Sequence, residues 1–197
     1  MSQRGFMGRI GAVAAVAFAL AGCVSSGAPQ AYDLTAPQSF ARGGGQRGQL
    51  LVVEPKAIAS LDTERIAVRN PAGAFSYLTD GAWADRLPKL LQARMIQAFE
   101  NANRLRSVGR PGDRLTGDYQ LISDIRSFEV VTGGSTEVVI DMAVRIVNER
   151  TGRILAGQVF RARANASGTT APAVSAAFNE AAQQALRDIV VWTAGQI

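Results

Sequence analysis

An alternation of apolar and polar residues fills much of the second half of this chain. In 136–148, five apolar side chains occupy every second position: Val138, Ile140, Met142, Val144 and Ile146. The segments 118–131 and 154–166 have the same period, which is that of a β-strand. Short polar turns, 132–136 and 148–152, separate the three segments. We therefore expect an antiparallel meander that can have one face in solvent.

The alternation in 118–131 changes phase partway along. Leu121, Ser123 and Ile125 share one face, whereas Phe128 and Val130 fall on the other. One extra residue would restore a common face, so the pattern predicts a bulge in this strand or a change of burial.

Two segments have helical spacing. Residues 85–103 and 172–193 carry apolar stripes, with charged side chains mostly on the opposite side. Pro88 is tolerated if it lies in the first helical turn, and Asp85 or a neighbour is then expected to cap the helix. Trp83, just before this helix, can either stack on a ligand or pack onto the core.

Shorter strands are expected in the first half, at 49–55, 64–70 and 74–78, with a turn at 70–73 and a brief strand near Val108. These elements predict an α+β fold: a two-layer sandwich of a mainly antiparallel sheet with two amphipathic helices packed on one face. Residues 49–197 are expected to form this single domain.

The chain begins like an exported protein. Arg4 and Arg9 precede an apolar run over 10–20, as in a signal peptide. Leu20, Ala21, Gly22 and Cys23 then resemble a bacterial lipobox, in which Cys23 receives a diacylglyceryl group and an N-acyl chain such as palmitate. Residues 1–22 would be removed. A plain signal peptide with a chance cysteine, or a free structural thiol, is the alternative.

After Cys23, the composition up to residue 48 is rich in Ser, Gly, Ala, Pro and Gln. We interpret 23–48 as the acylated N-terminus and a flexible tether, with a mean reach of about 25–30 Å. Tyr32 and Leu34 interrupt it and could form a short strand docked on the domain. Val24 and Ser25 replace the aspartate that favours inner-membrane retention, so the periplasmic leaflet of the outer membrane is expected.

Composition excludes several chemistries. The 197 residues include no histidine and one cysteine, so disulfides within the chain and all His-dependent sites are ruled out. Of the 21 basic residues, two lie in the predicted signal, leaving 19 against 16 acidic ones. The basic residues are scattered and do not alternate with aromatic ones, so no nucleic-acid partner is expected.

The remaining groups give weak support for catalysis. Asp62 and Glu64 could hold a cation or simply line a solvated edge, and helix capping explains at least one of Asp80 and Asp85, which flank Trp83. The run Gly43–Gly45 lacks the Gly-Lys-Ser/Thr ending of a phosphate-binding loop. We predict no catalytic residue, no metal and no cofactor apart from the covalent lipid, and therefore no enzyme.

The order of parts resembles the ABC-type transport auxiliary lipoproteins, a PqiC-like family associated with MCE-domain transport systems. The resemblance rests on the lipobox, "YDL", "LLVVEP", "WADRL", "DYQLISDIRSFE" and "RTGRILAGQVF", and it covers about 20–192. It implies an outer-membrane accessory lipoprotein without catalytic residues. Its partners would be a periplasmic MCE-domain protein with an ABC permease and ATPase, moving lipid or another hydrophobic molecule.

Docking would use packed apolar and arginine contacts, so Arg126, Asp141 and Arg145 on the solvated strand face, with the loops 56–64 and 70–81, are the predicted contact sites. A merely solvent-facing role is the alternative for these charges. Docking to a symmetric ring would suit a homo-oligomer. A structural or assembly lipoprotein of the cell wall or outer-membrane machinery is the rival function, and a hydrolase with an oxygen-only acid–base pair is a third.

Overall fold

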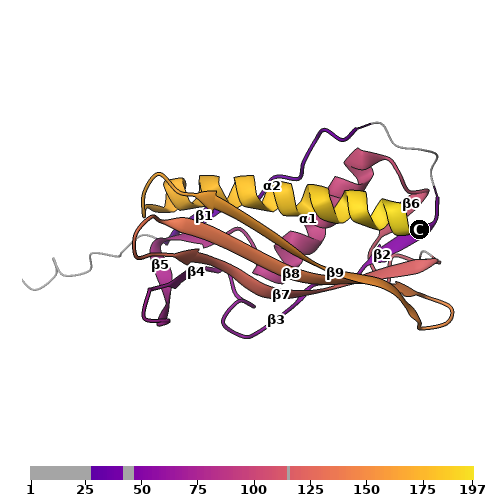
Figure 1. Ribbon diagram of the computed structural model, residues 1–197, viewed down its shortest axis with the longest axis horizontal. Coiled ribbons are helices and arrows are strands. Elements are labelled where there is room, and N and C mark those ends of the chain that lie inside the picture. Colours follow the sequence, from indigo (N-terminus) through magenta and orange to yellow (C-terminus); the bar gives the residue numbers. More distant parts are fainter. Residues whose placement is uncertain (1–27, 42–46, 115) are drawn as a thin grey trace, which may run out of the picture.

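Two helices cover one face of a nine-stranded sheet in the computed structural model, which describes residues 28–41, 47–114 and 116–197 (Figure 1). The helices are α1 (Leu87–Ala102) and α2 (Ala171–Gln196). The strands are β1 (Gln30–Tyr32), β2 (Gln49–Val52), β3 (Lys56–Ala57), β4 (Arg65–Arg69), β5 (Phe75–Trp83), β6 (Ser107–Gly109), β7 (Tyr119–Val131), β8 (Glu137–Asn148) and β9 (Ile154–Asn165). The predicted α+β class is confirmed.

The meander predicted from the alternation is the backbone of the fold. β7 pairs antiparallel with β8, and β8 pairs antiparallel with β9, along almost their whole lengths. The apolar positions of β8 are buried under the helices, while its charged positions face outward. Among the described residues β9 pairs only with β8, so it forms one edge of the sheet.

The phase change in β7 is a β-bulge. The register of β7 against β8 shifts between Ile125 and Ser127, which makes Arg126 the extra residue. Because of this insertion, Phe128 and Val130 face the same core as Leu121. The predicted bulge is confirmed.

The other side of β7 is lined by short strands in parallel. β2, β3 and β4 pair with successive parts of it, β6 pairs with β2, and β1 pairs with β5. β4 and β5 form an antiparallel hairpin whose turn at 70–73 is confirmed. β5 is longer than the predicted 74–78, because its second half gains β1 as a partner.

Helix α1 starts differently from the prediction. Pro88 lies in the first turn, as expected, but the N-cap residue is Arg86 and no side chain caps the helix. The Leu87 N–H donates to the Thr63 carbonyl at 3.0 Å instead. The Asp85 carboxylate accepts from the Arg86 N–H, one residue before the helix, so Asp85 is not its cap.

Trp83 belongs to an aromatic cluster in the core. Its ring meets those of Phe128 and Phe178 edge-on, with centroids 5.7 and 5.0 Å away, and those two rings stack at 4.9 Å. All three side chains are buried, so the packing role is confirmed for Trp83 and it is not exposed for ligand stacking.

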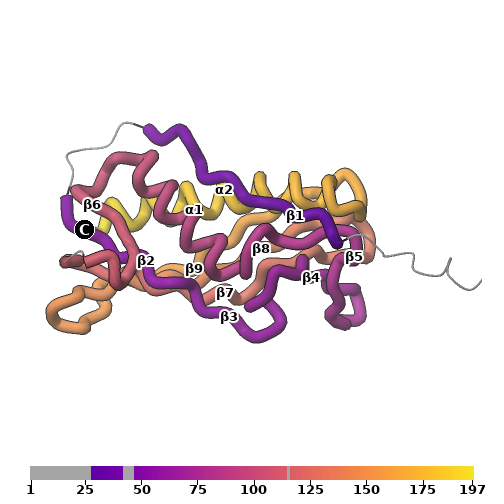
Figure 2. Tube along the Cα trace, turned by 180° about the vertical axis from the view of Figure 1, so that it is seen from behind, coloured from indigo at the N-terminus to yellow at the C-terminus, as the bar shows by residue number. Residues whose placement is uncertain are grey.

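Residues 33–41 run as an extended strap across both helices (Figure 2). Leu34 is fully buried, Thr35 is hydrogen-bonded to Asn179 of α2, and the Pro37 carbonyl accepts from Asn101 of α1. The docked strand predicted at Tyr32 is present as β1. The described part of the predicted tether is therefore packed on the domain, whereas Leu20, Ala21, Gly22 and Cys23 lie outside the described residues.

Candidate functional surfaces

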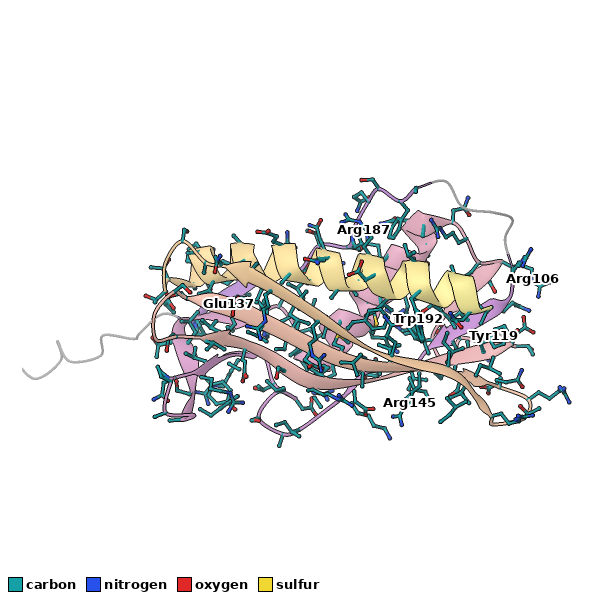
Figure 3. The ribbon with its side chains drawn as sticks, in the orientation of Figure 1. Arg106, Tyr119, Glu137, Arg145, Arg187 and Trp192 are labelled. Atoms are coloured by element: carbon teal, nitrogen blue, oxygen red, sulfur yellow. The ribbon has the colours of Figure 1, made fainter. Side chains whose placement is uncertain are left out.

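The sheet face opposite the helices carries rows of paired charges. Arg161 on β9 binds Asp141 on β8 at 2.8 Å, and Arg145 on β8 binds Asp124 on β7 at 2.6 Å. Arg163 binds Glu137 at 2.7 Å in the same way. Arg145 and Glu137 mark this face in Figure 3. Each pair joins neighbouring strands, so these charges first of all match the strands to one another.

The three predicted docking residues thus have different surroundings. Asp141 and Arg145 lie on one face but are engaged in ion pairs. Arg126 is exposed at the bulge, beside the residue that pairs with Asp141, and makes no ion pair or side-chain hydrogen bond with another described residue. The structure places the three on the same sheet face without contact between them, and only Arg126 offers an unpaired charge.

An ion pair between a partly exposed arginine and a buried carboxylate lies beside them, and sequence reasoning missed it. Arg69 on β4 donates two hydrogen bonds of 2.8 Å to the Glu129 carboxylate, which is only 5% exposed. The hydrogen bond to Glu129 raises the pKa of Arg69, so the guanidinium stays charged. The partners are 60 residues apart, and only the placement of an acid between buried Phe128 and Val130 hinted at the pair.

The carboxylates considered for catalysis or metal binding do not converge. Asp62 receives the guanidinium of Arg86, at 2.9 Å from Nε. Asp80 accepts the first N–H of α2, from Ala171, at 3.1 Å, so one of the two aspartates that flank Trp83 does bind a helix start, that of the second helix. Glu64 is exposed. In the described part of the chain, no three His, Cys, Asp or Glu residues gather as metal ligands.

Asp85 forms an ion pair with Lys89, one turn further along, at 2.8 Å. The hydrogen bond from Lys89, followed by that from the Arg86 backbone, holds the pKa of Asp85 below its ordinary value. A carboxyl group with a lowered pKa is a poor proton donor or acceptor near neutral pH. The arrangement therefore stabilises the start of α1 and is unlike that of a general acid or base.

One shallow hollow lies between the edge strand β9 and α2. It has a volume of about 500 Å³, is open to solvent, and is lined in part by Phe160, Arg161, Val191 and Trp192. Phe160 and Trp192 meet edge-on at 5.4 Å and close its floor. None of the helices in the described ranges has the length and apolar content needed to cross a membrane.

Comparison with known proteins connects this chain to a described protein family. The sequence profile of one family, described as the ABC-type transport auxiliary lipoprotein component, matches residues 32–190. An uncharacterized protein of Bradyrhizobium diazoefficiens, bll6063, is 34% identical over 163 residues, which is 82% of this chain and 44% of that protein. The chain thus spans less than half the length of this relative.

Two solved structures have the same fold. Protein XCC0632 from Xanthomonas campestris is 26% identical, with a TM-score of 0.76 covering 86% of this chain and 96% of that one. The hypothetical protein CT253 from Chlamydia trachomatis is 10% identical, with a TM-score of 0.56 over 76% and 97% of the two chains. At 10% identity the likeness shows the fold alone.

Proposed function

We propose that this chain, which belongs to the ABC-type transport auxiliary lipoprotein family, is a non-enzymatic accessory protein of an intermembrane transport system. It is held by lipid on Cys23 at the periplasmic face of the outer membrane. Its folded domain docks to a periplasmic MCE-domain protein, whose inner-membrane partners are an ABC permease and ATPase. The cargo is a phospholipid or another hydrophobic molecule.

The match to the family over residues 32–190 is the observation that carries this proposal. It covers nearly the whole described domain, including the strap and the second helix. The lipobox-like Leu20–Cys23 lies just before the matched region, where an anchor for such a domain is needed. Two or three acyl chains on one residue make release from a bilayer very slow.

The side chains of the domain support a binding role. Apart from Arg126, the charged groups named on the outer sheet face pair with each other, and the carboxylates at the start of α1 are bound by Arg86 and Lys89. The interior is filled by apolar side chains, including the cluster of Trp83, Phe128 and Phe178. Such a domain works through its surface, because the described side chains form no converging acid–base pair.

The experiment has two parts. Intact-mass analysis of the mature protein should show a chain that starts at Cys23 and carries three acyl chains, and fractionation should recover it with the outer membrane. Affinity capture from gently solubilised envelopes should then recover the MCE-domain protein and its permease. Recovery of cell-wall or barrel-assembly components in their place would contradict the transport role, and an unmodified thiol would contradict the anchor.

A further inference from the structure

The two ends of the domain differ sharply in charge. One end is formed by three connections: the hairpin tip 70–74, the turn 132–136 and the loop 166–170. None of these fifteen residues is acidic or basic. We call this the uncharged end; Arg69 and Glu137, each held in an ion pair, and Asp80, which binds the Ala171 N–H, border it.

Direct contacts hold the three connections together. The Thr132 N–H donates to the Arg69 carbonyl at 3.0 Å, next to the hairpin tip. The Ala166 N–H donates to the Thr136 carbonyl at 2.9 Å. The loop then enters α2, whose first residue, Ala171, lies against Gly81 of β5. The uncharged end is therefore one continuous surface.

The described chain also begins at this end. β1 pairs with β5 in the register Gln30 with Gly81, so the start of the domain lies beside the start of α2. Only seven residue steps separate Cys23 from Gln30, which limits the distance between them to about 25 Å. The connection is short because residues 33–41, the strap, are packed across the helices. They therefore add no length between Cys23 and the start of the domain.

The opposite end is rich in arginine. It is formed by 47–49, 104–106, Asp118 and 148–155, and backbone hydrogen bonds connect these segments, such as Glu149 N–H to the Asp118 carbonyl at 3.0 Å. We call it the far end. It carries five arginines (Arg47, Arg104, Arg106, Arg150 and Arg153) against Asp118 and Glu149. In Figure 3, Arg106 at this end lies opposite Glu137, which begins β8 beside the uncharged end.

The turn before β9 combines free charge with exposed apolar surface. Ile154 and Leu155 are 60% and 49% exposed, although both are large apolar residues. The register of β9 against β8 shifts between Ile146 and Val147. The resulting bulge leaves Ile154 and Leu155 at the surface, outside the core. Arg150 and Arg153 beside them make no ion pair with any other described residue, unlike Arg145, Arg161 and Arg163 of the sheet face.

We propose that the domain stands on the membrane with its uncharged end. The far end, around Ile154 and Leu155, binds a periplasmic protein that presents an apolar patch edged by carboxylates. Exposed apolar residues flanked by arginine form the centre of many protein interfaces. The unpaired guanidinium groups of Arg150 and Arg153 select an acidic partner and speed its association. This inference rests on the lipid anchor and the docking role proposed above, and adds the surface and its chemistry.

The geometry also disfavours a lipid occupant for the far end. Anionic lipids attract arginine, but α2, which runs between the two ends, has 26 residues and is about 39 Å long. A connection of at most about 25 Å that leaves from the uncharged end keeps the far end off the bilayer unless the domain lies flat.

The orientation is tested with the full acylated protein in vesicles of phosphatidylethanolamine and phosphatidylglycerol. Acylation occupies the thiol of Cys23, so one engineered cysteine is the only labelling site. An environment-sensitive fluorophore on Ser135→Cys or Ser167→Cys should be quenched strongly by spin-labelled lipid. The same fluorophore on Glu149→Cys, at the far end, should be quenched at least fivefold less than at either of these two positions. Equal quenching at Glu149→Cys would mean that the far end binds lipid, and would overturn the proposal.

The docking surface is tested in cells with a photo-crosslinking amino acid at Leu155. The comparison site is Ile58, which is 62% exposed and lies in the 56–64 loop, the competing contact site expected from the sequence alone. We expect an adduct with one protein, identified by mass spectrometry, at Leu155 and at least tenfold less at Ile58. The double substitution Arg150→Glu with Arg153→Glu should reduce it about tenfold, whereas Arg187→Glu on α2 should not.

The outcomes separate this inference from the proposed function. An adduct with the MCE-domain protein supports both. An adduct with a different identified envelope protein supports the docking surface but contradicts the transport role. If the MCE-domain protein crosslinks equally at Leu155 and Ile58, or if Leu155 gives no adduct, the docking surface is refuted.

Discussion

Gly133 shows how tightly the uncharged end is packed. Its φ of +132° is unfavourable for any residue with a side chain, and an added Cβ would lie 2.2 Å from a ring carbon of Pro71. The neighbouring Gly134 has open space around the same position. The first glycine is therefore required by the contact between the turn and the hairpin tip, and the second is not.

Gly133→Ala should therefore reduce the free energy of unfolding by about 1–3 kcal/mol, since it adds both backbone strain and a steric clash. Gly134→Ala should change it by less than about 0.5 kcal/mol. Urea denaturation of the unacylated Cys23→Ser chain measures both. Equal effects for the two substitutions would mean that the turn and the hairpin tip are not in contact.

Asp85 gives a pH dependence with a defined sign. Its pKa is lowered in the folded state, so its ion pair stabilises the fold above the ordinary value of 3.8 and is lost as the pH falls through the folded value. The difference in unfolding free energy between the parent chain and Asp85→Asn should be constant above about pH 5 and should disappear on acidification. Lys89→Met should raise the pKa of Asp85 in a carboxyl NMR titration. A difference that grows in acid would contradict this assignment.

At the scale of the elements, the bulge in β7 decides which side chains fill the core. Deleting Arg126 would remove the extra residue and leave a strictly alternating strand, in which Phe128 and Val130 still face the core and Ser127 still lies opposite Asp141. We expect cooperative unfolding to be retained, because the core keeps its side chains and only the local bend of the strand is lost. Arg126→Ala, which keeps the register, should leave stability within about 0.5 kcal/mol. Near-UV circular dichroism of the Trp83 cluster should be retained in both variants, and a deletion variant that loses it would contradict the bulge assignment.

The elements also show what the sequence could predict. The long strands, both helices and the bulge follow from local period, because each segment has one apolar face that must be buried. The parallel pairing of β2, β3 and β4 along β7 was not predicted, because it joins segments up to about 70 residues apart and has no local signature. For the same reason the Arg69–Glu129 pair was missed. The partners of Asp141 and Arg145 are only 20 and 21 residues away, but which residues face each other depends on the exact register of the three strands, which the turns alone do not fix.

At the scale of the whole molecule, the contrast between the two ends is invisible in the linear sequence. The three connections of the uncharged end lie about 60 and 30 residues apart, and each alone is an ordinary polar turn. They become one surface only because the fold brings the β7–β8 turn and the start of α2 to the same end of the sheet as the tip of the β4–β5 hairpin. The strap has a comparable effect: residues with the composition of a linker are packed on the helices, which leaves a short connection to Cys23.

The length of that connection gives the last prediction. If seven residue steps hold the uncharged end on the bilayer, then inserting twenty Gly and Ser residues after Ser26 should release it, because such a linker adds a mean reach of about 25 Å. Quenching of a fluorophore at Ser135→Cys should fall severalfold, while the urea midpoint stays unchanged because the insertion lies before β1 and the strap. Inserting the same residues into the exposed turn at Thr151 is the control and should leave the quenching as it was. Unchanged quenching after the first insertion would mean that the uncharged end binds lipid by itself, without help from the short connection.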